Sequence, residues 1–338
     1  MSFSVGIVGL PNVGKSTLFK LLTKKSVEIG NYPFTTLSPN IGLTLLLDER
    51  LKRISEIVKP EKVTFPTIKF IDIAGLVKEA HKGEGLGNQF LAQIRICDAL
   101  LIVLRGFEKE NVENVLGEIN PQKEIEILKL ELIMKDIETV RNAISKLEKK
   151  REMKERIELL KKIESEILKE KLISQLSLSE EEIREIKEYQ FLTQKPYLCL
   201  LNTNKKELPF KKEHLKINLK EEEEISELSK EEIKELGLNS NLEKVIKACY
   251  NLLSLITFYT IAGERESKGW VLKKGSKILE AGRMVHSDFE KKFIRAEVLN
   301  WRDLIEARGW INAKRMGKVK IVGKDYEVKD GDIIEFKI

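Results

Sequence analysis

The first residues that could do chemistry form a glycine-rich loop near the start of the chain. From Gly9 to Ser16 the sequence reads GLPNVGKS and fits the pattern G-x-x-x-x-G-K-[ST]. An apolar run precedes this loop and a helical pattern follows it, so backbone N–H groups can converge on phosphate oxygens at a helix N-terminus. Lys15 would then reach the β- and γ-phosphates, and the hydroxyl of Ser16 would bind Mg²⁺. The loop predicts a nucleoside triphosphate site and leaves the base and the biological role open.

A second set of candidate ligands lies further along the chain. Asp72 ends an apolar run and opens the sequence DIAGL. Its carboxylate would hold the metal through a water, and the N–H of Gly75 would sense the γ-phosphate. Between the two sets lies NYPFTTLSPNIG, a polar segment that contains Thr35 and Thr36. A threonine there can close over Mg²⁺ only while the γ-phosphate is bound, so we expect a nucleotide-dependent switch.

The residues expected to assist hydrolysis depart from the Ras-like pattern. Leu76 follows Gly75 where Ras-like proteins carry a water-orienting Gln, and a leucine side chain can neither donate nor accept a hydrogen bond. His81, in the segment KEAHKGEGLGN, is the candidate that would place the water instead. The alternative is that His81 lies in solvent without a role. The leucine predicts slow intrinsic turnover.

The base can be judged from the end of a later apolar run, YLCLLN. A guanine site needs an aspartate three residues after the asparagine at a strand end, and here Lys205 stands three residues after Asn202. Lysine has no acceptor, so the guanine reader is missing. A shifted frame from Asn204 to Glu207 would restore an acid only if the strand end slipped by two residues. ATP is therefore the preferred nucleotide, with base contacts from Asn202 and the backbone near Thr203; relaxed specificity and GTP are the alternatives.

An α/β fold must position these candidates. Strand-like apolar runs alternate with helical patterns along the chain: FSVGIVGL, TIKFIDIAG, ALLIVLRGF and PYLCLLNTN. Such alternation is typical of a parallel sheet with helices on both faces. The phosphate-binding loop would then lie where the first strand ends.

A helical arm is expected between two of these strands. No proline lies between Pro121 and Pro196. Two apolar series with spacings of 3 and 4 predict helices that fold back as a hairpin: Leu130, Ile133, Ile137, Val140, Ile144 and Leu147, then Met153, Ile157, Leu160, Ile163 and Ile167. Ser179 with Glu182 would cap a third helix. Over 123–190 there are sixteen basic and seventeen acidic residues, so a solvated arm is the first interpretation and a docking arm for a large partner the second.

The pattern changes again from about Leu255. Short strand-like runs, WVLKKG, KVKIVG and IIEFKI, are separated by turn signals and predict a small α+β domain. This region has eighteen basic and thirteen acidic residues. Trp270, Trp301 and Trp310 would either fill its core or help to contact RNA.

The predicted domains are 1–122 with 191–254, then 123–190, then 255–338. A composition of 42% hydrophobic and 34% charged residues supports folded cores under a mixed-charge surface. The net charge of +6 permits contact with nucleic acid without requiring it. Three cysteines far apart in apolar runs fit a reducing compartment. No apolar run reaches the ~18 residues of a membrane span, so we expect a cytoplasmic monomer without membrane contact.

Several of these motifs together resemble one family. GLPNVGKSTLF, NYPFTTLSPN, DIAGLV and GEGLGNQFLAQIR are similar to the Obg-related translation-factor NTPases, most closely to the YchF or Obg-like ATPase family. The run AGRMVHSDFEKKFIRAEV, with GKDYEVKDGDIIEF further on, resembles the TGS domain. The likeness covers nearly the whole chain. It implies a P-loop NTPase sheet with an inserted α-helical coiled-coil arm and a C-terminal ubiquitin-like β-grasp (TGS) domain.

The resemblance also implies roles for particular residues. Phosphate contacts would come from the loop and the first turn after it: Asn12, Val13, Gly14, Lys15, Ser16 and Thr17. Ser16 and Thr36 would hold Mg²⁺, since the family pattern keeps threonine at the second place and varies the first. Relatives with PN in this loop use the asparagine to hold K⁺ where an arginine finger would act, so K⁺ stimulation through Asn12 is a hypothesis.

The resemblance further implies an ATPase that associates with the ribosome or a ribosomal subunit, with RNA contact through the TGS domain. The family has Asn-x-x-Glu where this chain has Asn202 and Lys205, so the chain departs from its relatives at the base. Two alternatives stay open: an Obg-type GTPase of ribosome assembly, and a nucleotide-gated regulator that binds proteins.

Overall fold

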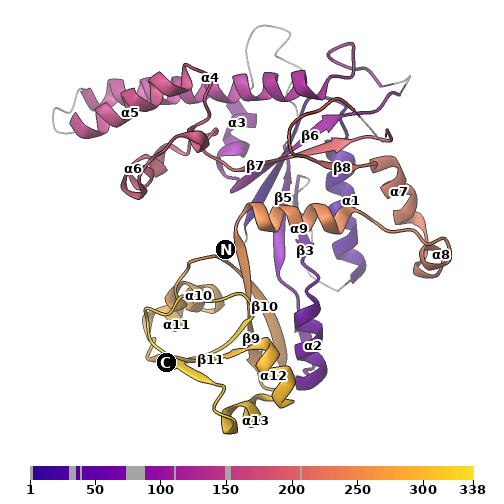
Figure 1. Cartoon of the computed structure of the whole chain (residues 1–338), viewed down its shortest axis with the longest axis vertical. Helices are drawn as coiled ribbons and strands as arrows, with labels where there is room; N and C mark the ends of the chain where they lie inside the picture. Colours follow the sequence, from indigo (N-terminus) through magenta and orange to yellow (C-terminus); the bar gives the residue numbers. More distant parts are fainter. Residues whose placement is uncertain are drawn as a thin grey trace.

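The computed structural model describes residues 3–29, 36–38, 40–73, 88–109, 112–148, 154–205 and 208–338; for 25–29, 36–38, 88–90 and 230 it describes the backbone alone. Figure 1 shows three parts: a central sheet with its helices, a long helical arm, and a second sheet with short helices at the C-terminal end. This arrangement confirms the α/β class, the helical insertion and the separate C-terminal sheet that the sequence predicts.

The central sheet has seven strands in the order β2-β3-β5-β1-β6-β7-β8. Five of them run parallel to one another: β1 (Ser4–Val8), β5 (Thr67–Asp72), β6 (Ala99–Arg105), β7 (Tyr197–Asn202) and β8 (Leu215–Ile217). The edge formed by β3 (Ile41–Leu45) and β2 (Thr36–Ser38) is antiparallel. All residues of β1 and β6 are buried, as expected for parallel strands covered on both faces. The carboxyl ends of β1, β5, β6 and β7 therefore meet at one edge of the sheet.

Helices cover this sheet and contribute to one core: α1 (Lys15–Ile29), α3 (Asn88–Arg95), α7 (Leu219–Glu227) and α9 (Leu242–Leu252). The short helix α8 (Lys230–Glu235) lies outside this core (Figure 1). α1 packs on β1, β3 and β5, whereas α9 packs on β6 and β7. The three cysteines predicted to be free lie buried as thiols, and burial raises the pKa of each to about 12.

The arm is built on α4 (Pro121–Glu148), which α5 (Lys154–Ile167) follows back; η2 (Ile173–Gln175), α6 (Glu180–Ile186) and η3 (Lys187–Tyr189) complete it. The predicted hairpin is confirmed, because Val140 and Ile144 of α4 share a core with Leu160 and Ile163 of α5. The predicted cap of the third helix is confirmed as well, since Ser179 and Glu182 each accept the other's backbone N–H.

The prediction is wrong for one residue of the first apolar series. Leu130 is 43% exposed, although its spacing fits the apolar series. The reason is that the first three turns of α4 face the central sheet, not α5: Ile125, Leu128 and Leu132 belong to the core of the sheet. α4 therefore passes from one core into another, and the apolar face of its N-terminal part is turned away from Leu130.

The C-terminal sheet has six strands in the order β12-β11-β13-β9-β10-β4. They are β4 (Lys62–Thr64), β9 (Leu255–Ala262), β10 (Glu266–Lys273), β11 (Arg295–Asn300), β12 (Lys320–Val322) and β13 (Asp332–Lys337). Four short helices accompany them: α10 (Ile278–Val285), α11 (Ser287–Lys291), α12 (Trp301–Ala307) and α13 (Trp310–Arg315). The three tryptophans pack in part against the apolar clusters of this region, which favours the core-filling interpretation.

A segment from the N-terminal part of the chain completes this second sheet. Strand β4 pairs in parallel with β10, and α2 (Glu49–Val58) packs beside α12 (Figure 1). Leu51 and Ile54 of α2 are fully buried in a cluster with Tyr259. The domain limits predicted from the sequence stay a prediction, and the structure adds that 49–64 packs with the C-terminal sheet.

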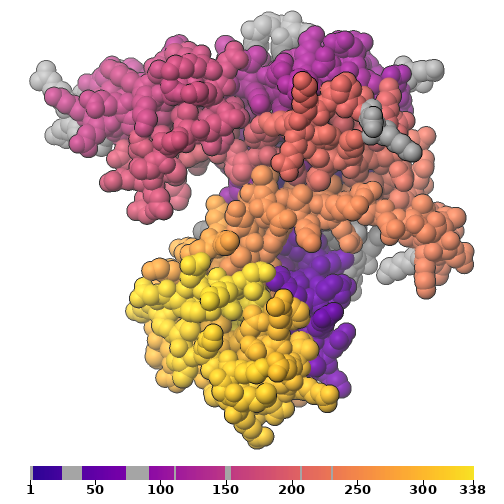
Figure 2. All heavy atoms as spheres, viewed as in Figure 1, coloured from indigo at the N-terminus to yellow at the C-terminus, as the bar shows by residue number. Residues whose placement is uncertain are grey.

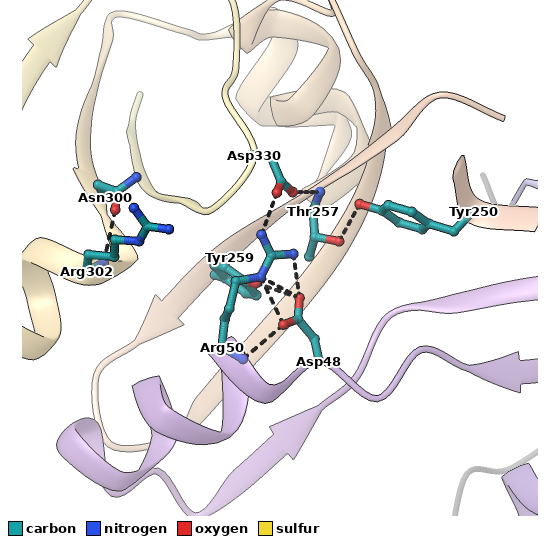
Figure 3. A network of polar contacts seen from close by, with 8 residues as sticks. All are labelled: Asp48, Arg50, Tyr250, Thr257, Tyr259, Asn300, Arg302 and Asp330. Atoms are coloured by element: carbon teal, nitrogen blue, oxygen red, sulfur yellow. Dashed lines mark hydrogen bonds and ion pairs between the residues drawn. The ribbon is translucent and has the colours of Figure 1, made fainter. Parts of the chain in front are cut away.

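A polar network fastens α2 to that sheet (Figure 3). Arg50 donates to both carboxylate oxygens of Asp48 and, through Nη1 at 2.6 Å, to Asp330. The hydroxyl of Tyr259 donates to Asp48 Oδ2 at 2.6 Å, and Asp330 accepts the backbone N–H of Thr257 at 2.8 Å. Burial alone would raise the pKa of Asp48, but the bonds from Arg50 and Tyr259 hold it below its usual value. Residues that lie 211 and 280 positions apart in the sequence thus share one charged network.

Among the residues that the structure describes, none of the helices has the length and apolar character that crossing a membrane would need.

Candidate nucleotide-binding site

The predicted phosphate-binding loop connects β1 to α1. Gly14 has φ of +107°, and a Cβ atom there would lie 2.7 Å from Leu219 Cδ1 and 2.8 Å from Asn202 Nδ2. A Cβ atom on Gly9 would lie 2.4 Å from the carbonyl oxygen of Val103. Both positions therefore require glycine, because any side chain would push the loop off the neighbouring strands. Asn12 also has a positive φ, of 62°, so the loop turns sharply before the helix begins.

The side chain of Lys15 is buried at the start of α1. It is 9% exposed, and its Nζ donates to the carbonyl oxygen of Leu10 at 2.8 Å, which keeps it folded over the loop. Burial lowers the pKa of Lys15, while the nearby carboxylates of Asp72 and Glu124 oppose that change. A cation held over a loop of backbone N–H groups is arranged to receive phosphate oxygens.

The residues predicted to hold Mg²⁺ fit that ion where the structure describes them. Asp72, at the end of β5, is 6% exposed, and its Oδ1 atom has no hydrogen-bond partner among the described residues. Leaving a buried carboxylate oxygen unpaired is costly, and a metal-bound water would satisfy it. Ser16 is exposed in the first turn of α1. Strand β2 begins at Thr36, whose side chain lies outside the described residues.

The other residues that are predicted to contact phosphate lie in or next to the same loop. Val13 is buried at 1% exposure, and Thr17 is half-buried in α1. Gly75 and His81, predicted to sense the γ-phosphate and to place water, lie outside the described residues, as do Thr35 and Leu76. Their roles stay predictions.

On the base side, Asn202 joins three elements at the end of β7. Its Nδ2 donates to the carbonyl oxygen of Val13 at 3.0 Å, and its Oδ1 accepts the N–H of Leu219 at 3.1 Å. This buried amide thus ties the phosphate loop to the start of α7. Each end of the amide retains the capacity for one further hydrogen bond, so the predicted base contact from Asn202 stays possible in chemical terms.

Lys205 is directed toward the segment that follows β6. The hydroxyl of Thr203 donates to the carbonyl oxygen of Gly106 at 2.8 Å and accepts the N–H of Lys205 at 3.0 Å. The ammonium group of Lys205 then pairs with the carboxylate of Glu108 at 2.9 Å. The cation that replaces the expected acid is therefore neutralised by an acid from another loop. Both side chains are largely exposed, so this pair is worth little in stability.

Two charged residues beside the loop were not predicted from the sequence. Glu124, in the first turn of α4, is 1% exposed and accepts the N–H of Arg105 at 3.0 Å. Burial raises the pKa of Glu124 to about 7, although the bond from Arg105 and the charge of Lys15 both lower it. Glu124 lies next to Ile125 on the buried face of α4. This position beside a buried apolar residue is the sequence signal that could have indicated a buried glutamate. Arg105 ends the buried strand β6 and is 3% exposed.

These elements define the class. A glycine loop lies between a buried strand and a helix, a buried lysine lies over that loop, and an aspartate at the end of a parallel strand keeps one carboxylate oxygen without a partner among the described residues. These are the parts of a P-loop NTPase of the GTPase fold. A family model described as "50S ribosome-binding GTPase" matches residues 4–142. The model of the YchF C-terminal domain, described as "Protein of unknown function (DUF933)", matches residues 255–338.

Full-length relatives identify the family. The chain is 41% identical to the protein named ribosome-binding ATPase YchF of Bacillus subtilis and 42% identical to that of Haemophilus influenzae, over 100% of this chain and 99% of each relative. The solved structure of the Schizosaccharomyces pombe YchF GTPase is 31% identical, with a TM-score of 0.87 over 99% of this chain and 98% of that chain. The chain belongs to the YchF family.

Proposed function

We propose that this protein is a Mg²⁺-dependent switch ATPase that binds and slowly hydrolyses ATP and associates with the ribosome. The observation that carries the nucleotide part is the buried pair of Lys15 and Asp72 beside the glycine loop, with one carboxylate oxygen left for a ligand. The ribosomal part is supported by the relatives, which are named ribosome-binding ATPases.

ATP is proposed over GTP because the base side lacks a suitable acid. An aspartate that could accept the two guanine N–H groups is replaced by Lys205, and Glu108 holds that cation. Asn202 and the backbone near Thr203 would contact the base, as the sequence predicts. One name among the relatives reads ATPase and another GTPase, so the base is a direct experimental question.

The described residues suggest how the site would act on the triphosphate. Lys15 would leave the carbonyl of Leu10 and bind the β- and γ-phosphates, since the two interactions compete for the same ammonium group. Mg²⁺, when bound by Ser16, Thr36 and the water on Asp72, would neutralise charge on the phosphates. Asn12 would hold K⁺ near the same charge.

The remaining roles fall on residues outside the described part. Gly75 would sense the γ-phosphate, and His81 would orient water, because Leu76 cannot. An alanine at position 81 that left turnover unchanged would remove His81 from this account.

The partner surface is proposed on the arm and the C-terminal domain. Figure 2 shows that the arm extends to the left of the central domain, that the C-terminal domain lies below it, and that an open notch separates the two. The C-terminal domain has eighteen basic and thirteen acidic residues, which favours contact with ribosomal RNA. We propose that the protein acts as a monomer in the cytoplasm.

Calorimetry tests the nucleotide part. Titrations of ATP and GTP with Mg²⁺ present are expected to show the tighter affinity for ATP. Lys15→Ala should abolish binding, whereas Lys20→Ala, which removes an exposed charge from the same helix, should not. Equal or tighter GTP affinity would favour the Obg-type alternative, and undiminished binding by Lys15→Ala would refute the site.

Co-sedimentation tests the ribosomal part. The protein is expected to pellet with ribosomal particles in a way that depends on a non-hydrolysable ATP analogue. If RNA dominates the contact, binding should fall steeply with salt and be lost after nuclease treatment. Binding that survives nuclease would point to a protein partner, and no nucleotide-dependent pelleting at moderate salt would refute ribosome association.

A further inference from the structure

The connection between β6 and α4 is organised by one buried arginine. The guanidinium group of Arg105 donates to three backbone carbonyl oxygens of this connection: those of Phe107 at 3.2 Å, Val112 at 2.9 Å and Glu113 at 2.9 Å. Its plane also lies over the ring of Phe107, with 4.7 Å from Cζ to the ring centroid. A rigid planar group that makes three bonds to one segment fixes the path of that segment.

The same segment contacts the phosphate-binding loop. The carbonyl oxygen of Glu113, which Arg105 holds, also accepts Nδ2 of Asn12 at 3.2 Å. A carbonyl oxygen can only accept, so the NH₂ end of the Asn12 amide must face Glu113. The Oδ1 atom of Asn12 is therefore the end that is turned away from Glu113. The position of one backbone carbonyl thus decides which way this exposed amide points.

Arg105 is itself fixed from the arm side. Its backbone N–H donates to Oε2 of Glu124 at 3.0 Å, and Glu124 lies in the first turn of α4. The end of β6, the start of the arm helix and the phosphate loop are therefore connected through Arg105. All the contacts in this series are made between protein groups, so none of them needs a bound nucleotide.

We propose that Arg105 is a positioning residue for triphosphate hydrolysis: through the carbonyl of Glu113 it fixes the orientation of the Asn12 amide, with Nδ2 held toward Glu113 and Oδ1 left as the free acceptor of the phosphate-binding loop. Arg105 acts through Asn12 and touches no nucleotide. This inference rests on the proposed ATPase function and deepens it, because it names the residue that orients a side chain of the phosphate-binding loop.

A double-mutant cycle on ATP turnover tests the proposal. The four proteins are the wild type, Arg105→Lys, Asn12→Ala and the double variant; lysine keeps the charge but lacks the planar fork. Each single variant is expected to lower kcat by about fivefold, the factor that corresponds to one hydrogen bond, with KM nearly unchanged. The double variant should be no slower than the slower single variant, because both changes remove the same orientation.

Two further variants keep the test decisive. Phe107→Leu removes the ring beneath the guanidinium group but no hydrogen bond, so it can replace Arg105→Lys in the cycle if that protein fails to fold, with a smaller loss of kcat. Lys109→Ala removes an exposed charge from the same connection and should match the wild type.

Effects of Arg105→Lys and Asn12→Ala that multiply in the double variant would overturn the role of Arg105 while leaving the ATPase proposal intact. A wild-type chain that does not hydrolyse ATP would instead overturn the proposed function, and this inference with it.

Discussion

The buried carboxylate of Glu124 gives a sharp prediction about stability and pH. Its pKa lies at about 7 in the folded protein, against an ordinary value of 4.5, because burial disfavours the charged form. Between these two values the folded state holds more protons than the unfolded state. The free energy of unfolding must therefore fall as pH rises through this interval. Glu124→Gln removes the titration while keeping an acceptor for the N–H of Arg105.

The magnitude follows from the two pKa values. The two pKa values, about 7 and 4.5, differ by about 2.5, and each pKa unit corresponds to about 1.4 kcal/mol, so the whole effect is about 3.5 kcal/mol. The assay is urea unfolding of the nucleotide-free wild type and variant from about pH 5 to pH 8. The free energy of unfolding of the variant, relative to that of the wild type, is expected to rise by about 2–3 kcal/mol from pH 5 to pH 8, with most of the rise below pH 7.

Two comparisons decide the outcome. Glu126→Gln, on the exposed face of the same helix, should show a difference from the wild type that does not depend on pH. If the difference for Glu124→Gln is equally constant, Glu124 ionises as an exposed glutamate does, and the reasoning from burial is refuted. A difference that shrinks as pH rises would have the wrong sign and would refute it as well.

The other predictions concern the phosphate-binding loop, the polar network between α2 and the C-terminal sheet, and the monovalent cation. Gly14→Ala should weaken nucleotide affinity measured by calorimetry by about tenfold or more, because a side chain at this φ is strained and would meet Leu219; Gly117→Ala, with positive φ but no neighbour within 4 Å, should not. Arg50→Ala should lower the free energy of unfolding by about 2–3 kcal/mol in urea titrations, since Asp48 loses its partner, whereas Arg53→Ala on the exposed face of α2 should match the wild type. Replacing K⁺ by Na⁺ should slow ATP turnover about fivefold if Asn12 holds the cation, and equal rates would exclude that role.

The features that the sequence predicts correctly are those whose residues lie close together along the chain. The phosphate loop is contiguous, and its glycines, lysine and serine act within eight residues, so the motif alone places them. The buried strands β1 and β6 read as unbroken apolar runs because both faces of a parallel sheet are covered. The cap formed by Ser179 and Glu182 is equally local, and the structure contains it as predicted.

The errors and omissions arise where distant partners decide the outcome. Periodicity shows that α4 has an apolar face but not which core each turn meets, and Leu130 fits the apolar series although it lies in neither core. Arg105 and Glu124 were missed because charged residues are usually solvated, and their burial depends on each other and on Lys15. The bonds that Asn202 makes to Val13 and Leu219, both distant in the sequence, could not be predicted from local signals, and its contact with the base stays a prediction.

The position of α2 and β4 changes how the chain should be divided in physical terms. β3 pairs with β2, where Thr36 lies, and β5 ends at Asp72; the chain between β3 and β5 is α2 and β4. That connecting segment belongs to the C-terminal sheet by hydrogen bonding, by the cluster of Leu51 and Ile54, and by the ion pair of Arg50 with Asp330. β5, which ends at Asp72, and β3, the partner of the strand with Thr36, are therefore both connected at their far ends to a segment that packs on the C-terminal sheet. Because α2 and β4 pack on the C-terminal sheet, that sheet holds the ends of β3 and β5 that lie away from the predicted metal site.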